Sequence, residues 1–306
     1  MKNKFPESFQ NRGKCRCPLM NNRPPRVAAI HALAGFGRSS LAVVIPTLSA
    51  MGVQVCPIPT AVMSTHTGGL GELVHRDLSD YIYPTVEHYQ RLSVDLEGIY
   101  SGFLSRPSQA GDMKSFISAY PDALAVVDPV MGDHGKLYRT YTPELVEQIR
   151  LLVQSAAVIT PNLTEAYLLL GETYRHEPLT RQQLKSMMAR LSELGPRYVV
   201  ITGAELASGE CANVGYDRRQ NAYWCVNYDY VPTSYPGTGD IFASVLTGAM
   251  LTGDSFPMAM DRATCFVELA IKTTFSYGTD TRYGVMLEKC LGWLTHREVL
   301  TNYQLL

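Results

Sequence analysis

Two glycines and an aspartate stand at the start of a predicted helix, in the stretch Gly237-Thr238-Gly239-Asp240. Apolar residues then recur three and four positions apart, which predicts a helix over about 240–253. Glycines let the backbone turn tightly and let its N–H groups approach a ligand without a Cβ in the way. Those groups and the helix N-terminus favour bound anions. The sequence therefore predicts an anion hole at this helix start, formed with the N–H groups of Gly237 and Gly239.

The carboxylate of Asp240 beside this anion hole has two interpretations. An acidic residue in the first turn stabilises a helix through its dipole by about 0.3–1 kcal/mol. Alternatively, Asp240 is a general base that takes a proton from an attacking hydroxyl while the anion hole holds a phosphoryl group. An aspartate alone does not decide between them, and the preceding Gly-Thr-Gly favours the second.

Polar residues also follow three predicted strands elsewhere in the chain. In a parallel sheet these positions meet at one edge, where ligands bind. Any one of the residues alone is better explained as a helix cap or loop residue. Together they indicate a metal and phosphate site, and they are Asp128, Asp133, Asn162, Thr164, Glu165 and Thr202.

The elements that must position these residues alternate along the chain. Short apolar runs ending in turn residues predict buried parallel strands over 26–30, 53–60, 97–103, 123–130, 156–162 and 197–203. Helical periodicity predicts helices after Ser39 and over 143–153, 164–170, 180–194, 240–253, 257–276 and 281–295. Shorter strands over 211–217 and 222–231 form a predicted hairpin. Pro46 conflicts with the first helix, because an interior proline costs about 3 kcal/mol and should kink it.

Alternating strands and helices predict an α/β fold with a mostly parallel central sheet and helices on both faces. No composition shift or long linker divides residues 26–306, which are expected to form a single domain. Residues 1–25 are basic and rich in Asn and Pro, without the apolar segment of a signal peptide. They are expected to be a disordered tail.

Composition excludes several functional classes. The net charge of −1 and the absence of a Lys/Arg block argue against nucleic acid as a partner. No apolar run approaches the roughly 18 residues of a membrane span. The seven cysteines are scattered, which fits reduced thiols in the cytoplasm. Only Cys15 and Cys17 are close together, and without a second Cys/His pair they are a weak metal signal.

Other nucleotide-binding motifs are missing from the chain. Neither a G-x-x-x-x-G-K-[ST] loop nor the H-R-D and D-F-G motifs of protein kinases occur. The stretch GFGRSS, over 35–40, partly matches a dinucleotide-binding fingerprint. However, Ser40 stands at its third glycine, and no acidic residue ends the next strand. A nicotinamide-dependent oxidoreductase is therefore disfavoured.

The order of these motifs resembles the pyridoxal/pyridoxamine kinase branch of the ribokinase-like superfamily. The resemblance covers roughly 26–293, through GFGRSSLAVVIPTLSAMGVQVCPIPTAVMSTHTGG, IYSGF, VVDPVMGDHGKLY, ITPNLTEAYLLLGE, VVITG and GTGDIFAS. GTGD is typical of the superfamily, and STHTGG with DPVMGD and TPNLTEA narrows it to vitamin B6 kinases. The resemblance implies a ribokinase-like fold and ATP-dependent, Mg²⁺-dependent phosphorylation of the 5′-hydroxymethyl group of pyridoxal, pyridoxamine or pyridoxine.

The resemblance also implies roles for individual residues. Asp240 would be the catalytic base beside an anion hole made of Gly237, Thr238 and Gly239. The Mg²⁺-binding residues would be Glu165 and Asp128, partly through water. The ATP-binding residues would be Asp128, Asp133, Tyr138, Thr160, Asn162 and Thr202. The substrate-binding residues would be Ala32, Met63, His66, Thr67, Phe103 and Asp240.

Three positions depart from the pattern of that family. Ala32 and Ala34 stand where members carry polar residues, and Phe103 stands where many pyridoxal kinases have Tyr. The ring of a substrate would therefore meet fewer polar partners, which weakens affinity and discrimination. The sequence leaves open whether His31 compensates for Ala32.

Two alternative functions stay open beside the B6 kinase. One is a hydroxymethylpyrimidine kinase, which shares the GTGD motif and acts on a hydroxymethyl-bearing heterocycle. The other is a B6-binding or regulatory protein with impaired catalysis, suggested by the two alanines and opposed by the intact Asp240 and Glu165. The resemblance further implies a homodimer, and it leaves a monovalent cation requirement open.

Overall fold

The computed structural model describes residues 23–296 and 300–306. The predicted tail therefore lies outside the described residues except for 23–25, and so do Cys15 and Cys17. Arg23 pairs with the carboxylate of Glu97 at 2.9 Å.

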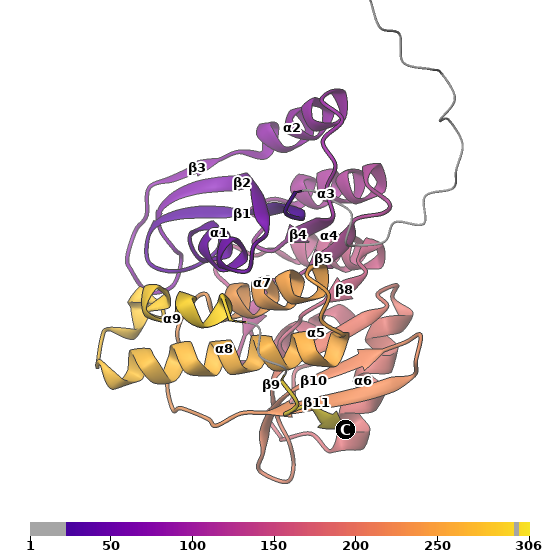
Figure 1. The fold of residues 1–306 in the computed structure, drawn as a ribbon, viewed down its shortest axis with the longest axis vertical. Coiled ribbons are helices and arrows are strands. Elements are labelled where there is room, and N and C mark those ends of the chain that lie inside the picture. Colours follow the sequence, from indigo (N-terminus) through magenta and orange to yellow (C-terminus); the bar gives the residue numbers. More distant parts are fainter. Residues whose placement is uncertain (1–22, 297–299) are drawn as a thin grey trace, which may run out of the picture.

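The described strands form a ten-stranded sheet in the order β12-β11-β10-β9-β8-β5-β4-β1-β2-β3 (Figure 1). The strands from β9 to β2 in this order are mutually parallel, and the neighbours at both edges are antiparallel. Their bounds are β1 Arg26–Phe36, β2 Gln54–Thr65, β3 His75–Asp77, β4 Gly98–Ser101, β5 Leu124–Val127, β8 Val158–Ile159, β9 Tyr198–Glu205, β10 Cys211–Asp217, β11 Ala222–Asn227 and β12 Gln304–Leu305. A separate hairpin pairs β6 Gly132–Asp133 with β7 Lys136–Leu137.

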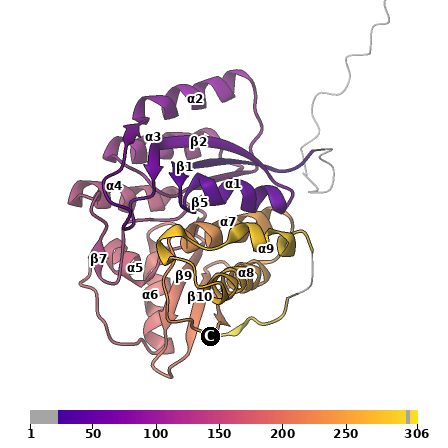
Figure 2. The same cartoon turned by 90° about the vertical axis from the view of Figure 1, so that its left-hand side faces the viewer.

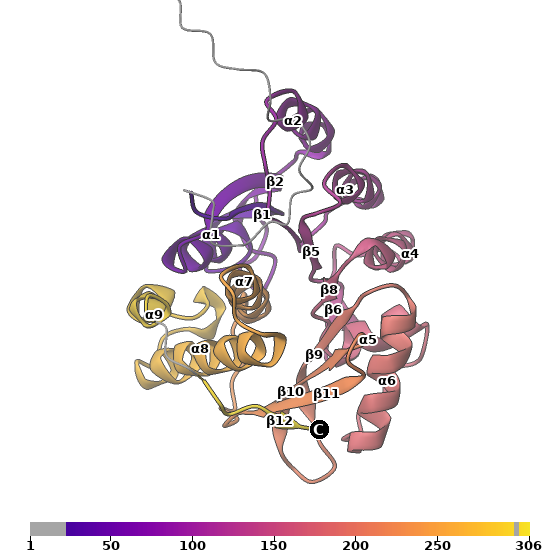
Figure 3. The same ribbon diagram turned by 45° about the vertical axis from the view of Figure 1, so that its right-hand side comes forward.

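Helices cover both faces of the sheet, as Figure 3 shows. The helices of one face are α2 Ser79–Arg91, α3 Pro107–Ala119, α4 Pro143–Leu152, α5 Leu163–Leu170 and α6 Arg181–Glu193. Those of the other face are α1 Leu41–Ala50, α7 Thr238–Leu251, α8 Phe256–Ser276 and α9 Leu287–Leu294. Short 3₁₀ turns occupy Val153–Ser155 and Thr281–Tyr283.

Strand β1 shows how the sequence builds two cores. Its side chains alternate between the faces, so Ala28 and Ile30 enter the core beneath α2–α6. Val27 and Ala29 enter the core beneath α1, α7, α8 and α9. A central parallel strand is buried on both sides, which explains its continuous apolar run. The predicted α/β fold with a mostly parallel sheet is confirmed.

Helices α1 and α7 lie side by side on one face of the sheet (Figures 1 and 2). Both begin at the edge where the central parallel strands end, and α1 continues through Pro46. Their first turns therefore bring the stretch after β1 next to the Gly-Thr-Gly-Asp stretch. This pairing positions the candidate site.

Several elements differ from the sequence prediction. The predicted helix over 281–295 is a 3₁₀ turn followed by α9, because Gly284 adopts a φ of 74° between them. Helices α2 and α3 and strands β3, β6, β7 and β12 were not predicted. In the part of the chain that the structure describes, no helix has both the length and the apolar character needed to span a membrane.

Candidate active site

Two glycines lie at the start of α7, and only the first of them is required by the packing of the chain. Gly237 caps the helix at a φ of 84°, and a Cβ there would lie 2.1 Å from the carbonyl oxygen of Arg38. Gly237 is thus required by the fold. A Cβ on Gly239 would meet only Oδ2 of Asp128, at an ordinary 3.9 Å. Packing within the chain does not require Gly239, which leaves its N–H open to close approach by a ligand.

Asp240 occupies the first turn of α7 with its side chain 11% exposed. Its Oδ2 accepts a hydrogen bond of 2.8 Å from the backbone N–H of Ser40. Burial raises the pKa of Asp240 to about 6, and the Ser40 hydrogen bond opposes this rise. Such a carboxylate is ionised at neutral pH and more basic than an ordinary aspartate, as a general base should be.

His31 approaches the other oxygen of this carboxylate. Its Nδ1 lies 3.6 Å from Oδ1 of Asp240, and the ring is fully buried. Its edge packs against the ring of Tyr100, with 4.4 Å between centroids. Burial lowers the pKa of His31 to about 3, so the imidazole is neutral. Sequence reasoning named His31 only as a neighbour of Ala32, although His31 directly follows the strand predicted over 26–30, where ligand-binding residues are expected. In the structure β1 extends to Phe36, so His31 lies in the middle of the strand.

Two further carboxylates, Asp128 and Glu165, are buried at the same edge of the sheet. The hydroxyl of Thr160 donates to Oδ1 of Asp128 at 3.0 Å. The backbone N–H groups of Met131 and Asn162 donate to Glu165 at 3.0 and 2.9 Å. Burial raises the pKa of both carboxyls, and the proximity of Asp240 to Asp128 and of Asp128 to Glu165 raises them further. A cation would relieve this repulsion.

These contacts show that the predicted strand ends share one edge. Asp128 follows β5, Thr160 follows β8, and Thr202 lies on β9. The backbone N–H of Thr202 donates to the carbonyl of Pro161 at 2.9 Å. Asn162 and Glu165 also form a reciprocal capping box at the start of α5. The structure therefore confirms that Asn162 caps a helix, namely α5.

The β6–β7 hairpin flanks the carboxylates. Asp133 is half-exposed on β6, and Tyr138 follows β7 with 41% exposure. Burial and the nearby carboxylates, first Glu165, raise the pKa of Tyr138. Thr164 accepts a hydrogen bond from the N–H of Gly135 at 2.9 Å, which ties the hairpin to α5. The hairpin is therefore anchored beside the acidic group.

The residues predicted to contact the substrate ring differ in accessibility. Thr67 is exposed, whereas Met63 and Phe103 are largely buried and Ala32 is fully buried. The Nε2 of His66 lies 2.7 Å from the carbonyl oxygen of Arg282, and its Nδ1 accepts from the N–H of Gly68 at 3.0 Å. Both nitrogens of His66 therefore bind backbone groups. This arrangement locks the segment around 282 onto the loop after β2.

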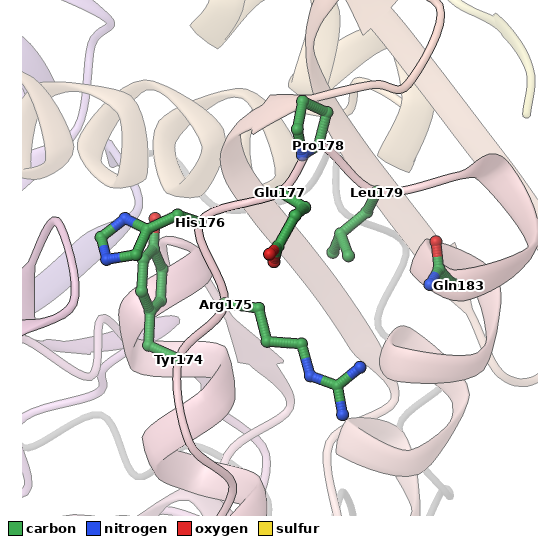
Figure 4. A pocket seen from close by; sticks show the side chains of 7 residues that line it. All are labelled: Tyr174, Arg175, His176, Glu177, Pro178, Leu179 and Gln183. Atoms are coloured by element: carbon green, nitrogen blue, oxygen red, sulfur yellow. The ribbon is translucent and has the colours of Figure 1, made fainter.

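The carboxylates of this site do not by themselves form a metal cluster. The described ranges hold no group of three or more His, Cys, Asp or Glu side chains placed to enclose a metal. Mg²⁺ in kinases is commonly bound by one or two carboxylates, water and substrate phosphates, so Asp128 and Glu165 still fit it. A separate hollow of about 560 Å³ lies at the loop that connects α5 to α6 (Figure 4). It is lined by Tyr174, Arg175, His176, Glu177, Pro178, Leu179 and Gln183.

Comparison with known proteins identifies relatives along most of the chain. The sequence profile of the family described as phosphomethylpyrimidine kinase matches residues 44–284. A candidate phosphomethylpyrimidine kinase from Bacteroides thetaiotaomicron VPI-5482, solved in two crystal forms, is 43% identical, with TM-scores of 0.89 and 0.88. These forms cover 94% and 93% of this chain and 100% of that one, and the second is an orthorhombic form with pyridoxal.

Two curated relatives represent two substrate classes. A pyridoxine/pyridoxal/pyridoxamine kinase from Bordetella bronchiseptica is 28% identical over 271 residues, covering 83% of this chain and 91% of the relative. A hydroxymethylpyrimidine/phosphomethylpyrimidine kinase from Mycobacterium bovis is 26% identical over 266 residues, with the same coverage. Both relatives are named as kinases, the first of B6 vitamers and the second of pyrimidines.

Proposed function

We propose that this chain, which belongs to the phosphomethylpyrimidine kinase family, transfers the γ-phosphoryl group of ATP to the 5′-hydroxymethyl group of a vitamin B6 vitamer. The observation that carries the proposal is the carboxylate of Asp240 in the first turn of α7, directly after Gly239. Its raised pKa suits a base, and the adjacent helix N-terminus suits a phosphoryl group. The B6 kinase relative and the related crystal form with pyridoxal support this substrate class.

In the proposed reaction, Asp240 takes the proton of the substrate hydroxyl. The hydroxyl oxygen forms a bond to the γ-phosphorus, the bond from that phosphorus to the bridging oxygen breaks, and ADP leaves. The N–H groups of Gly237, Thr238 and Gly239 stabilise the charge on the transferring group. Asp240 releases its proton to solvent after product leaves.

Mg²⁺ would be held by Asp128 and Glu165, partly through water, and would neutralise charge on the ATP phosphates. Burial and mutual repulsion raise the pKa of both carboxyls, and the positive charge of a bound cation would oppose this rise and favour their ionised forms. Asp133, Tyr138, Thr160, Asn162 and Thr202 would line the nucleotide side. Met63, Thr67 and Phe103 would border the ring of the substrate. His66 would instead stabilise the loop after β2, because both of its nitrogens bind backbone groups.

Hydroxymethylpyrimidine is the second candidate substrate. The family description and the mycobacterial relative favour it. Ala32 and Ala34 also remove polar side chains that B6 kinases carry near the ring, and both are buried. A catalytically impaired B6-binding protein is the third candidate.

The test is ADP release from Mg-ATP with pyridoxal, pyridoxamine, pyridoxine or hydroxymethylpyrimidine, each run with wild type and with Asp240→Asn. Turnover of a B6 vitamer that collapses in the variant supports the proposal. Turnover of the pyrimidine alone reassigns the substrate and keeps the mechanism. Binding of pyridoxal without turnover of any alcohol supports the third candidate.

We also propose that the protein is a cytoplasmic homodimer. The cysteines of the described residues are free thiols, as expected in a reducing compartment. Light scattering during size-exclusion chromatography tests the dimer, and a mass of 33.9 kDa would contradict it.

A further inference from the structure

His31 is an unusual residue to find in the centre of an α/β sheet. It lies on β1 between two apolar cores and is fully buried. Neither ring nitrogen has a hydrogen-bond partner among the described residues. Buried polar groups are nearly always hydrogen-bonded, so an imidazole without a partner requires an explanation.

The surrounding chain is shaped to admit this ring. A Cβ on Gly102 would lie 2.0 Å from Cε1 of His31, so any side chain at position 102 would displace it. Tyr100 packs on the ring edge, and its hydroxyl donates to the main-chain carbonyl of Asp240 at 3.3 Å. His31, Tyr100 and Asp240 therefore form one packed unit across β1, β4 and α7.

The ring also presents a specific atom to the carboxylate. Nδ1 faces Oδ1 of Asp240 at 3.6 Å, while Oδ2 is already bound by the N–H of Ser40. Because burial lowers the pKa of His31, the ring is neutral and carries a single N–H. With no acceptor near Nε2 in the described residues, the field of the carboxylate favours that proton on Nδ1. Catalytic hydrogen bonds are often long before substrates bind and shorten in the reactive complex.

We propose that His31 is a positioning residue for Asp240, with its Nδ1–H donating to Oδ1 in the substrate complex. Together with the N–H of Ser40, it fixes both carboxylate oxygens and directs a free lone pair toward the substrate hydroxyl. This inference rests on the proposed function for the role of Asp240 as base. The hydrogen bond itself does not depend on which alcohol is phosphorylated.

The first experiment determines which ring nitrogen of His31 carries the proton, in the absence of substrate. Spectra of ¹⁵N-histidine-labelled protein at neutral pH report which ring nitrogen is protonated, and loss of a signal in His31→Asn assigns the residue. We expect the proton on Nδ1. A proton on Nε2 leaves no donor facing Asp240 and overturns the proposal, whatever the protein phosphorylates.

The effect on turnover is tested with three substitutions of His31. Asn places an amide near the position of Nδ1, Gln places one near Nε2, and Leu has a similar volume without a polar atom. We expect kcat to fall about 10–100-fold in His31→Leu, with KM changed less than threefold. His31→Asn should recover most of kcat, and His31→Gln should not.

Thermal unfolding separates positioning from a structural role. Replacing an unpartnered buried imidazole by Leu should leave Tm unchanged or raise it, even as kcat falls. A kcat equal to wild type in His31→Leu, or equal losses in the Asn and Gln variants, would overturn the proposal. If His31→Leu does not fold, the comparison of Asn with Gln still decides. His88→Leu, at an exposed position on α2, is the control for the loss of a histidine.

The two proposals fail in different ways. If wild type turns over none of the alcohols, the proposed function fails, and the nitrogen spectra still decide whether His31 donates toward Asp240. If wild type is active and His31→Leu matches it, the positioning role fails and the proposed function stands.

Discussion

The backbone N–H of Ser40 donates to Oδ2 of Asp240 at 2.8 Å and so joins the starts of α1 and α7. Ser40 adopts φ 52° and ψ −136°, a conformation that non-glycine residues rarely hold and that costs about 1–3 kcal/mol. Its carbonyl accepts from the N–H groups of Val43 and Val44, both at 3.0 Å. The strained backbone conformation of Ser40 therefore accompanies the hydrogen bond from its N–H to the carboxylate of Asp240.

Asp240→Asn should lower kcat by about 10²–10⁴ while ATP affinity changes less than threefold. The amide oxygen can still accept from Ser40, so the fold of the site is kept and only the base is lost. Steady-state kinetics and ATP titration calorimetry measure the two quantities. Residual turnover within a few-fold of wild type would refute the role of Asp240 as base.

The pH dependence of turnover follows from the same group. A base with a pKa of about 6 is protonated below that value, so kcat/KM should fall about tenfold per pH unit on the acid side of pH 6. An ordinary exposed aspartate would place this limb near pH 4. Rates between pH 4.5 and 8, with stability checked at each pH, distinguish the two values.

The stability of the fold should respond to Asp240 with a defined sign. The folded-state pKa of about 6 exceeds the ordinary 3.8, so the folded protein binds this proton more tightly than the unfolded chain. The contribution to the unfolding free energy therefore falls as pH rises from about 4 to 6, and the penalty of about 1–3 kcal/mol persists above pH 6. Asp240→Asn should raise Tm at pH 7.5 and have little effect near pH 4. An equal Tm change at both pH values would contradict this linkage.

The sequence predicted the fold class and the strand ends because both follow from side-chain types at fixed spacing. The alternation of strands and helices is confirmed, and so is the resemblance to pyridoxal kinases of the ribokinase-like superfamily. Helices α2 and α3 were missed because Pro84 and Gly111 interrupt their patterns.

Contacts made by backbone atoms between distant segments were not predictable in this way. The N–H of Ser40 contacts Asp240 across 200 residues of sequence, and the carbonyl of Arg282 contacts His66 across 216. Nearly every residue type carries these backbone groups, so neither the composition nor the spacing of side chains predicts such a contact. The sequence places His31 directly after a predicted strand, but its burial and its lack of hydrogen-bond partners became known only from the structure.

Gly239→Ala should separate stability from activity. Alanine favours a helix over glycine by about 1 kcal/mol, and a Cβ at this position meets nothing closer than 3.9 Å. Tm should therefore stay the same or rise slightly, while kcat falls at least tenfold because the Cβ obstructs the approach of the phosphoryl group. Gly237→Ala is the contrasting variant, with a clash at 2.1 Å and positive φ, and it should lower Tm. Wild-type kcat in Gly239→Ala would exclude Gly239 from the anion hole.

Glu165→Gln should change the Mg²⁺ requirement without damaging the fold. A glutamine at this position of a capping box is already used in this chain, where Gln183 pairs with Thr180 at the start of α6. The amide oxygen can keep the hydrogen bond from the N–H of Asn162, so the start of α5 should persist. The amide NH₂ cannot accept from the N–H of Met131, so that buried group loses its partner and Tm should fall slightly. Loss of a carboxylate near the metal should raise the free Mg²⁺ needed for half-maximal rate about tenfold or more, which a Mg²⁺ titration at fixed ATP measures. An unchanged Mg²⁺ dependence would restrict Glu165 to its structural role as a helix cap.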